Sequence, residues 1–162
     1  MTEPETAETR HLQAQRALLD GLRREDDLSQ LERAVRQSKA NGFTPDLAVL
    51  QVGVAAMDLA HVNRSAPIAK AELIGQHLPE IDFRNQPALQ ERTTYALNAV
   101  AAIRGGLELD ILEDMYWWRT SDIVEYAVIA ATAYVRACAR LRRQTVQQFI
   151  NDLQAALERP QE

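Results

Sequence analysis

The sequence predicts an all-α protein, a single-domain bundle of about six helices with a long C-terminal helix. The length of 162 residues suits one domain. The composition, 46% hydrophobic and 25% charged, is that of a globular chain with its own core. Apolar residues recur at helical intervals of three and four. We therefore expect residues 9–158 to form the bundle, with disordered tails at 1–8 and 159–162.

Two apolar stripes mark the first two helices. Their members are Leu12, Leu19 and Leu22 in the first stripe and Leu28, Leu31 and Val35 in the second. On one straight helix the two stripes would point about 160° apart, so a break is expected between Arg24 and Asp27. Asp27 or Ser29 is the expected cap of the second helix, which Asn41 and Gly42 end.

The third helix is expected to lie in the centre of the fold. Thr44 and Pro45 have the spacing of an N-cap and a first helical residue, and the helix runs to about Val62. It is apolar around most of its circumference, which is typical of a buried helix. Asp58 and His61 share one face of it. We interpret them as a core histidine hydrogen-bonded to a carboxylate rather than as metal ligands.

The middle of the sequence predicts shorter elements. A short helix is expected from Ser65 to about His77, and a loop over Glu80–Gln86. Pro87 opens another helix, which Gly105 and Gly106 end. A short acidic helix is expected over Leu107–Trp118.

The last helix is predicted to run from about Ile123 to Glu158. At about 1.5 Å per residue it would be roughly 55 Å long, more than the core of one compact domain can cover. Its later apolar residues are rotated from the earlier stripe and need a second partner, either the N-terminal helix of the same chain or a second chain. This seam consists of Val146, Phe149, Ile150, Leu153 and Leu157.

The unmatched seam leads to the first functional hypothesis. The chain is expected to be a noncatalytic interaction or regulatory module that self-associates through its terminal helices, with residues 144–158 as an oligomerisation extension. The expected assembly is a homodimer, and a heterologous protein is a second option. This hypothesis assigns no catalytic residue and no cofactor.

The densest acidic region supports a second hypothesis, a small all-α enzyme acting on a nucleotide or phosphorylated substrate. The carboxylates of this region are Glu108, Asp110, Glu113, Asp114, Asp122 and Glu125, of which Asp110, Glu113, Asp122 and Glu125 are the candidate metal ligands. Carboxylate oxygens on neighbouring helices suit Mg²⁺, the cofactor in this alternative. Acidic residues also favour helix N-termini for electrostatic reasons, so the cluster has a structural interpretation as well.

Bulky amphipathic side chains meet at residues 115–119. Adjacent tryptophans on a helix point about 100° apart, so one can face the core and the other a pocket or a partner. Trp117, Trp118 and Arg119 are therefore candidates for a ligand pocket, with packing as the alternative interpretation.

A third hypothesis is a helix-turn-helix DNA-binding regulator using residues 47–78. The second of these helices offers Lys70 against Glu72, with Glu80 and Asp82 just beyond. The chain has 18 Lys and Arg residues against 23 Asp and Glu, for a net charge of −5. This balance disfavours binding to phosphate backbones.

The sequence also indicates a compartment. The first ten residues are acidic and polar, unlike a secretion signal, and the longest strongly apolar stretch, 123–135, is too short to span a bilayer. A single cysteine, Cys138, cannot form an internal disulfide and falls in an apolar helical stretch, where a buried thiol is expected. We expect a cytoplasmic protein without membrane contact.

Overall fold

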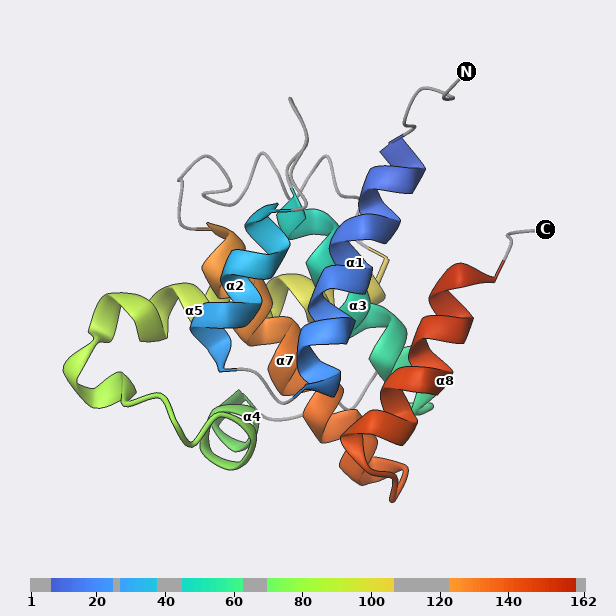
Figure 1. Ribbon diagram of the computed structural model, residues 1–162. Helices are drawn as coiled ribbons and strands as arrows, with labels where there is room; N and C mark the ends of the chain where they lie inside the picture. Colours follow the sequence, from blue (N-terminus) through green and yellow to red (C-terminus); the bar gives the residue numbers. More distant parts are fainter. Residues whose placement is uncertain (1–6, 25–26, 38–44, 63–69, 107–122, 160–162) are drawn as a thin grey trace.

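The computed structural model describes residues 7–24, 27–37, 45–62, 70–106 and 123–159 (Figure 1). Over these residues the structure contains seven α-helices, one short 3-10 helix and no strand, which confirms the all-α prediction. The elements are α1 (Ala7–Arg23), α2 (Leu28–Gln37), α3 (Pro45–Leu59), α4 (Lys70–His77), η1 (Phe83–Asn85), α5 (Pro87–Arg104), α7 (Ile123–Leu141) and α8 (Val146–Glu158).

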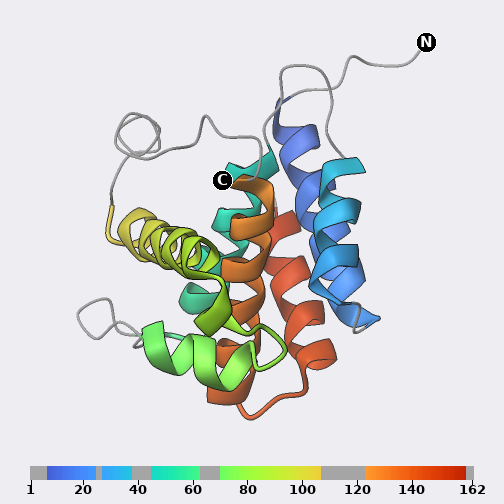
Figure 2. The same ribbon diagram turned by 90° about the vertical axis from the view of Figure 1, so that its left-hand side faces the viewer.

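Helix α7 forms the centre of the bundle. It packs against α2, α3, α4, α5 and α8, and its most extensive contact is with α3 (Figure 2). Between Val124 and Ala139 every side chain is buried except Glu125 and Arg136. The prediction that the helix from Pro45 lies in the centre is therefore confirmed, and α7, the first part of the predicted last helix, lies there with it.

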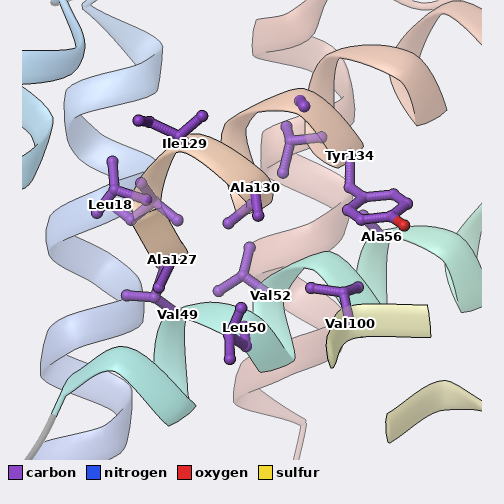
Figure 3. Packing of buried hydrophobic residues seen from close by; sticks show 14 of the residues in the cluster. Leu18, Val49, Leu50, Val52, Ala56, Val100, Ala127, Ile129, Ala130 and Tyr134 are labelled. Carbon is purple, nitrogen blue, oxygen red and sulfur yellow. The ribbon is translucent and has the colours of Figure 1, made fainter. Parts of the chain in front are cut away.

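The core is built where α3 crosses α5 and α7 (Figure 3). Gly53 of α3 permits this close approach, because a Cβ atom at that position would lie 3.0 Å from Cγ1 of Val100 and 3.5 Å from Cδ2 of Tyr134. The Tyr134 hydroxyl donates a hydrogen bond to the carbonyl oxygen of Leu97 at 3.1 Å, which joins α7 to α5 inside the core. Burial raises the pKa of Tyr134 to about 12.

Local residues set several helix ends as the sequence predicts. The Gln30 backbone N–H donates to Oδ1 of Asp27 at 2.9 Å, so Asp27 caps α2. Pro87 is the first residue of α5, where its missing N–H costs no helical hydrogen bond. At the other end of α5, Gly106 has φ +104°, which a glycine adopts readily.

The end of α3 corrects the expected Asp58–His61 pair. His61 has φ +55°, and the Val62 N–H donates to the Met57 carbonyl oxygen at 3.0 Å, a hydrogen bond typical of a Schellman C-cap. The left-handed residue leaves the helical register, and His61 is exposed rather than buried. Asp58 pairs with Nε of Arg104 at 2.9 Å instead.

The single long C-terminal helix predicted from the sequence is wrong, because the structure divides it into α7 and α8. Arg143 has φ +56°, and the Gln144 N–H donates to the Ala139 carbonyl oxygen at 3.0 Å, closing α7 with a second Schellman motif. Thr145 and Gln148 form a capping box that starts α8. As a result α8 turns back and packs along α1 (Figure 1).

Candidate functional site

A groove of about 400 Å³ lies between α2, the segment before α5, the start of α5 and the start of α7. Helix α2 packs on α1 and α7, and α4 packs on α7, whereas α2 and α4 are at most weakly packed on each other. The groove lies on the face of α7 next to α2, and α4 does not contribute to its lining. Glu125 and Ile129 of α7 line the groove on this face.

Four apolar side chains contribute to the lining of the groove, which is otherwise polar or charged, and these four are named its floor. Three of them are half-buried: Leu28 of α2, Ile81 in the segment before η1, and Leu89 of α5. The fourth, Ile129 of α7, is buried, with 3% exposure. Side chains that are half-covered by their own chain retain apolar surface that a ligand can remove from water. The volume is at the lower end of the range for small-ligand sites and is sufficient for a few inserted side chains.

Six charged side chains surround this floor: Glu32, Arg33, Arg36, Glu80, Asp82 and Glu125. Three of the carboxylates serve the fold. Glu32 accepts a hydrogen bond from Arg36 one turn along α2, and Glu80 accepts one from Nη1 of Arg136 at 3.2 Å. Asp82 accepts the Arg84 backbone N–H at 3.0 Å and caps η1. These interactions fix the walls of the groove.

Arg33 on α2 and Glu125 on α7 differ from the other charges. Both side chains are exposed, and neither has an ion-pair or hydrogen-bond partner among the described residues. Among the described residues the groove therefore presents one cation and one anion, from different helices, that do not pair with other side chains there. Because they are exposed, their contribution is to orientation and selectivity more than to affinity.

One wall of the groove is held by arginines of α7. Nη1 of Arg136 donates to the His77 carbonyl oxygen at 2.9 Å, in addition to its pairing with Glu80, and Nη1 of Arg140 donates to Oε1 of Gln76 at 3.0 Å. Partial burial and the neighbouring positive charge of Arg140 lower the pKa of the His77 imidazole, opposed in part by Glu72. Burial and Arg140 thus both favour the neutral form of His77.

The predicted interface residues on α8 are covered by their own chain. Phe149, Ile150 and Leu153 have 0% exposure, and Val146 and Leu157 are half-buried and packed against the core. The helices that cover them are α1, α3 and α7. The sequence left two partners open for this seam, the N-terminal helix of the same chain and a second chain. In the structure the seam packs on the N-terminal helix, α1. The expectation that this seam needs a second chain is corrected, because the break before Thr145 turns it inward.

Most residues of the other two candidate sites cannot be placed. Trp117, Trp118 and Arg119 lie outside the described residues, as do Asp110, Glu113 and Asp122 of the proposed Mg²⁺ site. Glu125 is exposed in the first turn of α7 and lines the groove. Within the described ranges, no three His, Cys, Asp or Glu side chains lie together as metal ligands would.

The helices of the DNA-binding alternative do not form a packed pair. Helix α3 is a core element and α4 packs on α7, with at most weak packing between α3 and α4. A helix-turn-helix motif instead packs its two helices on each other. The nearby arginines are engaged as well, since Nη1 of Arg142 donates to the Leu59 carbonyl oxygen at 3.3 Å. The arrangement gives this alternative no support.

Cys138 has the properties expected of a buried packing residue. Its side chain has 0% exposure, and burial raises the pKa of the thiol to about 12, despite the opposing charge of Arg104. A thiol is nucleophilic as its thiolate, so at neutral pH Cys138 in the folded chain is inert.

Sequence reasoning missed the groove because its lining comes from four separate segments. It recognised single features of the lining, namely the loop over Glu80–Gln86 and the capping signals near Ser29 and Glu32. One signal was available: the apolar stripe of α2 is narrow, so Arg33 had to face away from the main core.

Compared with known proteins, the chain matches no family model, no curated protein and no solved structure. Among the described helices, none combines the length and the hydropathy that crossing a bilayer requires.

Proposed function

We propose that this protein is a noncatalytic helical interaction module that holds a short segment of another protein in the groove between α2, α5 and α7. The observation that carries the proposal is a groove in which three half-buried apolar side chains, Leu28, Ile81 and Leu89, lie among six charged side chains. Interface anchors commonly bind in this way, with an apolar side chain in a pocket and charges around it.

The free charges of the groove define the chemistry of the partner. Glu125 favours a Lys or Arg on the side of α7, and Arg33 favours an Asp or Glu on the side of α2. The proposed ligand is therefore a peptide segment with an apolar anchor residue between a basic and an acidic residue. The remaining carboxylates of the groove are engaged with Arg36, Arg136 and η1, which supports a structural role for them rather than a role in catalysis.

Other surfaces of the described chain support the choice of the groove. The large apolar side chains that are exposed there are Tyr95, at 36%, and Leu141, at 57%, on two different helices. Two separate side chains do not make a broad apolar patch. As the location of the module we propose the cytoplasm, where a chain with a single unpaired cysteine is not exposed to disulfide formation.

A charge-reversal experiment tests the proposal. The probe is a library of short fluorescein-labelled helical peptides in which Leu stands between Lys and Glu, measured by fluorescence polarisation. Glu125→Lys should weaken the best peptide by about tenfold, and replacing the Lys of the peptide by Glu should restore binding. Asp152→Lys is the matched control, because it makes the same charge change on α8, outside the groove.

Two results would contradict the proposal. One is equal affinity of the peptides for the Glu125→Lys and Asp152→Lys chains, which would indicate attraction to the net charge alone. The other is unchanged binding after Leu89→Asp, which places a carboxylate on the apolar floor. Circular dichroism and thermal melting of each variant establish that the fold is retained.

A further inference from the structure

The geometry of the α7–α8 junction points to a second mode of association, independent of the groove: we infer that two copies of this chain can exchange α8. In the exchanged dimer, α8 of each copy occupies the site on α1, α3 and α7 of the other copy. Exchange of one element in this way gives a closed dimer with two identical halves.

The junction contains residues that can equally well continue a helix. Residues 142–145 are Arg, Arg, Gln and Thr, with neither glycine nor proline. Arginine and glutamine have high helix propensity, which is why the sequence alone predicts one continuous helix. The turn nevertheless requires Arg143 to adopt φ +56°, a left-handed conformation that is unfavourable for residues with a side chain.

Straightening the junction relieves this strain and moves α8 away from its own chain. In a continuous helix residues 142–158 would extend about 25 Å beyond α7, in reach of a second copy. The Schellman motif at Arg143 and the capping box of Thr145 favour the closed form. Backbone hydrogen bonds at the junction thus favour the closed form, and relief of the strain at Arg143 favours the extended form. A short strained hinge of this kind favours exchange.

The contacts of α8 with the rest of the fold can form equally well between copies. Glu158 pairs with Nε of Arg16 at 2.5 Å, Asn151 accepts from Nε of Arg23 at 3.3 Å, and Phe149 fills the core. An exchanged helix makes the same contacts. The free-energy cost of exchange is therefore chiefly the translational and rotational freedom that two chains lose when they form one dimer. Leu141, the last residue of α7, is 57% exposed, and two junctions lying side by side would cover it.

The experiment uses two variants of the full chain, Arg16→Cys and Glu158→Cys, and a short bismaleimide cross-linker. Mixed while folded, the two chains should give little cross-linked heterodimer. After joint unfolding in urea and refolding at high concentration, the heterodimer should appear. Glu158→Cys mixed with Arg84→Cys is the control, because the Arg84 side chain is 96% exposed on η1, which is at most weakly packed on α8.

Hinge variants determine whether the junction controls the exchange. Combined Arg143→Ala and Thr145→Ala should raise the yield of dimer by at least about tenfold over Arg143→Gly, which relieves the strain while keeping the turn. Two results would overturn the inference. One is a double variant that stays entirely monomeric, and the other is a dimer in which the cysteines at positions 16 and 158 are not cross-linked.

Discussion

The apolar face of α8 and the groove beside α2 lie against the same central helix, yet they differ in what covers them. The α8 face has large apolar side chains and is closed by α1, α3 and α7 of its own chain. The groove combines half-buried apolar residues with charges and is lined by α2, residues 80–86 and the first parts of α5 and α7 without being closed by any of them. The comparison teaches that apolar character alone does not identify an interface, since the apolar seam of α8 belongs to the core.

The largest difference between the two regions is expected from truncating one apolar residue in each. Phe149→Ala should destabilise the fold by about 3–5 kcal/mol, because it removes a fully buried ring and leaves a cavity. Leu89→Ala in the groove should cost about 1 kcal/mol, because that side chain is already half in water. Urea unfolding measures both. Equal losses would mean that α8 is no more part of the core than the groove is.

Two glycines sharpen the comparison of the core with its edge. Gly53→Ala should destabilise by about 1–2 kcal/mol, since the new methyl group meets the stiff side chain of Val100 at 3.0 Å. Gly75→Ala in α4 should stabilise by about 0.5–1 kcal/mol, because nothing lies within 4 Å and alanine is the better helix former. Thermal melting gives the sign of each change, and a stabilising Gly53→Ala would contradict the tight crossing of α3 with α5.

A buried hydroxyl on α7 offers a smaller test. Thr132 has 0% exposure and its Oγ1 lacks a hydrogen-bond partner in the described structure. Thr132→Val should therefore stabilise the fold by about 1 kcal/mol, since valine has the same shape without the unsatisfied polar atom. Thr94→Val is the control, because the Thr94 hydroxyl donates to the Gln90 carbonyl oxygen at 2.9 Å. This variant should gain no stability. Equal shifts in the two variants would count against the packing of Thr132.

The smallest effect is expected from pH. Burial lowers the pKa of His77 below 6.5 in the folded state, so the unfolded chain binds the proton more readily. The contribution of His77 to stability is present in full above pH 6.5 and decreases as the pH falls toward the lowered pKa. Urea midpoints from about pH 8 to about pH 5.5 should fall less in His77→Gln than in the parent chain. Parallel curves would show that His77 is equally solvated in both states.

Much of the fold could be predicted because its signals are local. The break before α2, the start of α5 at Pro87 and the buried character of α3 each follow from neighbouring residues. The turn at Arg143 could not be predicted by apolar spacing, because the chain there contains no helix breaker. The local signal was Thr145 followed three residues later by Gln148, which forms the capping box of α8.

The candidate site was less predictable for a physical reason. Its floor brings together residues as distant in sequence as Leu28 and Ile129, so no spacing rule relates them. The same holds for Asp58, which pairs with Arg104 rather than with the nearby His61. Contacts between distant segments depend on how the helices pack, which local propensity does not determine.

Hydrogen exchange of α8 at different protein concentrations tests most directly whether its apolar face is closed by its own chain. Purified monomer is measured at low and at high micromolar concentration by mass spectrometry, and the amides of Phe149, Ile150 and Leu153 are followed. We expect equal and strong protection at both concentrations, because the cover comes from α1, α3 and α7 of the same chain. Protection that is weak in dilute solution and rises with concentration would contradict the account, since a second chain would then supply the cover.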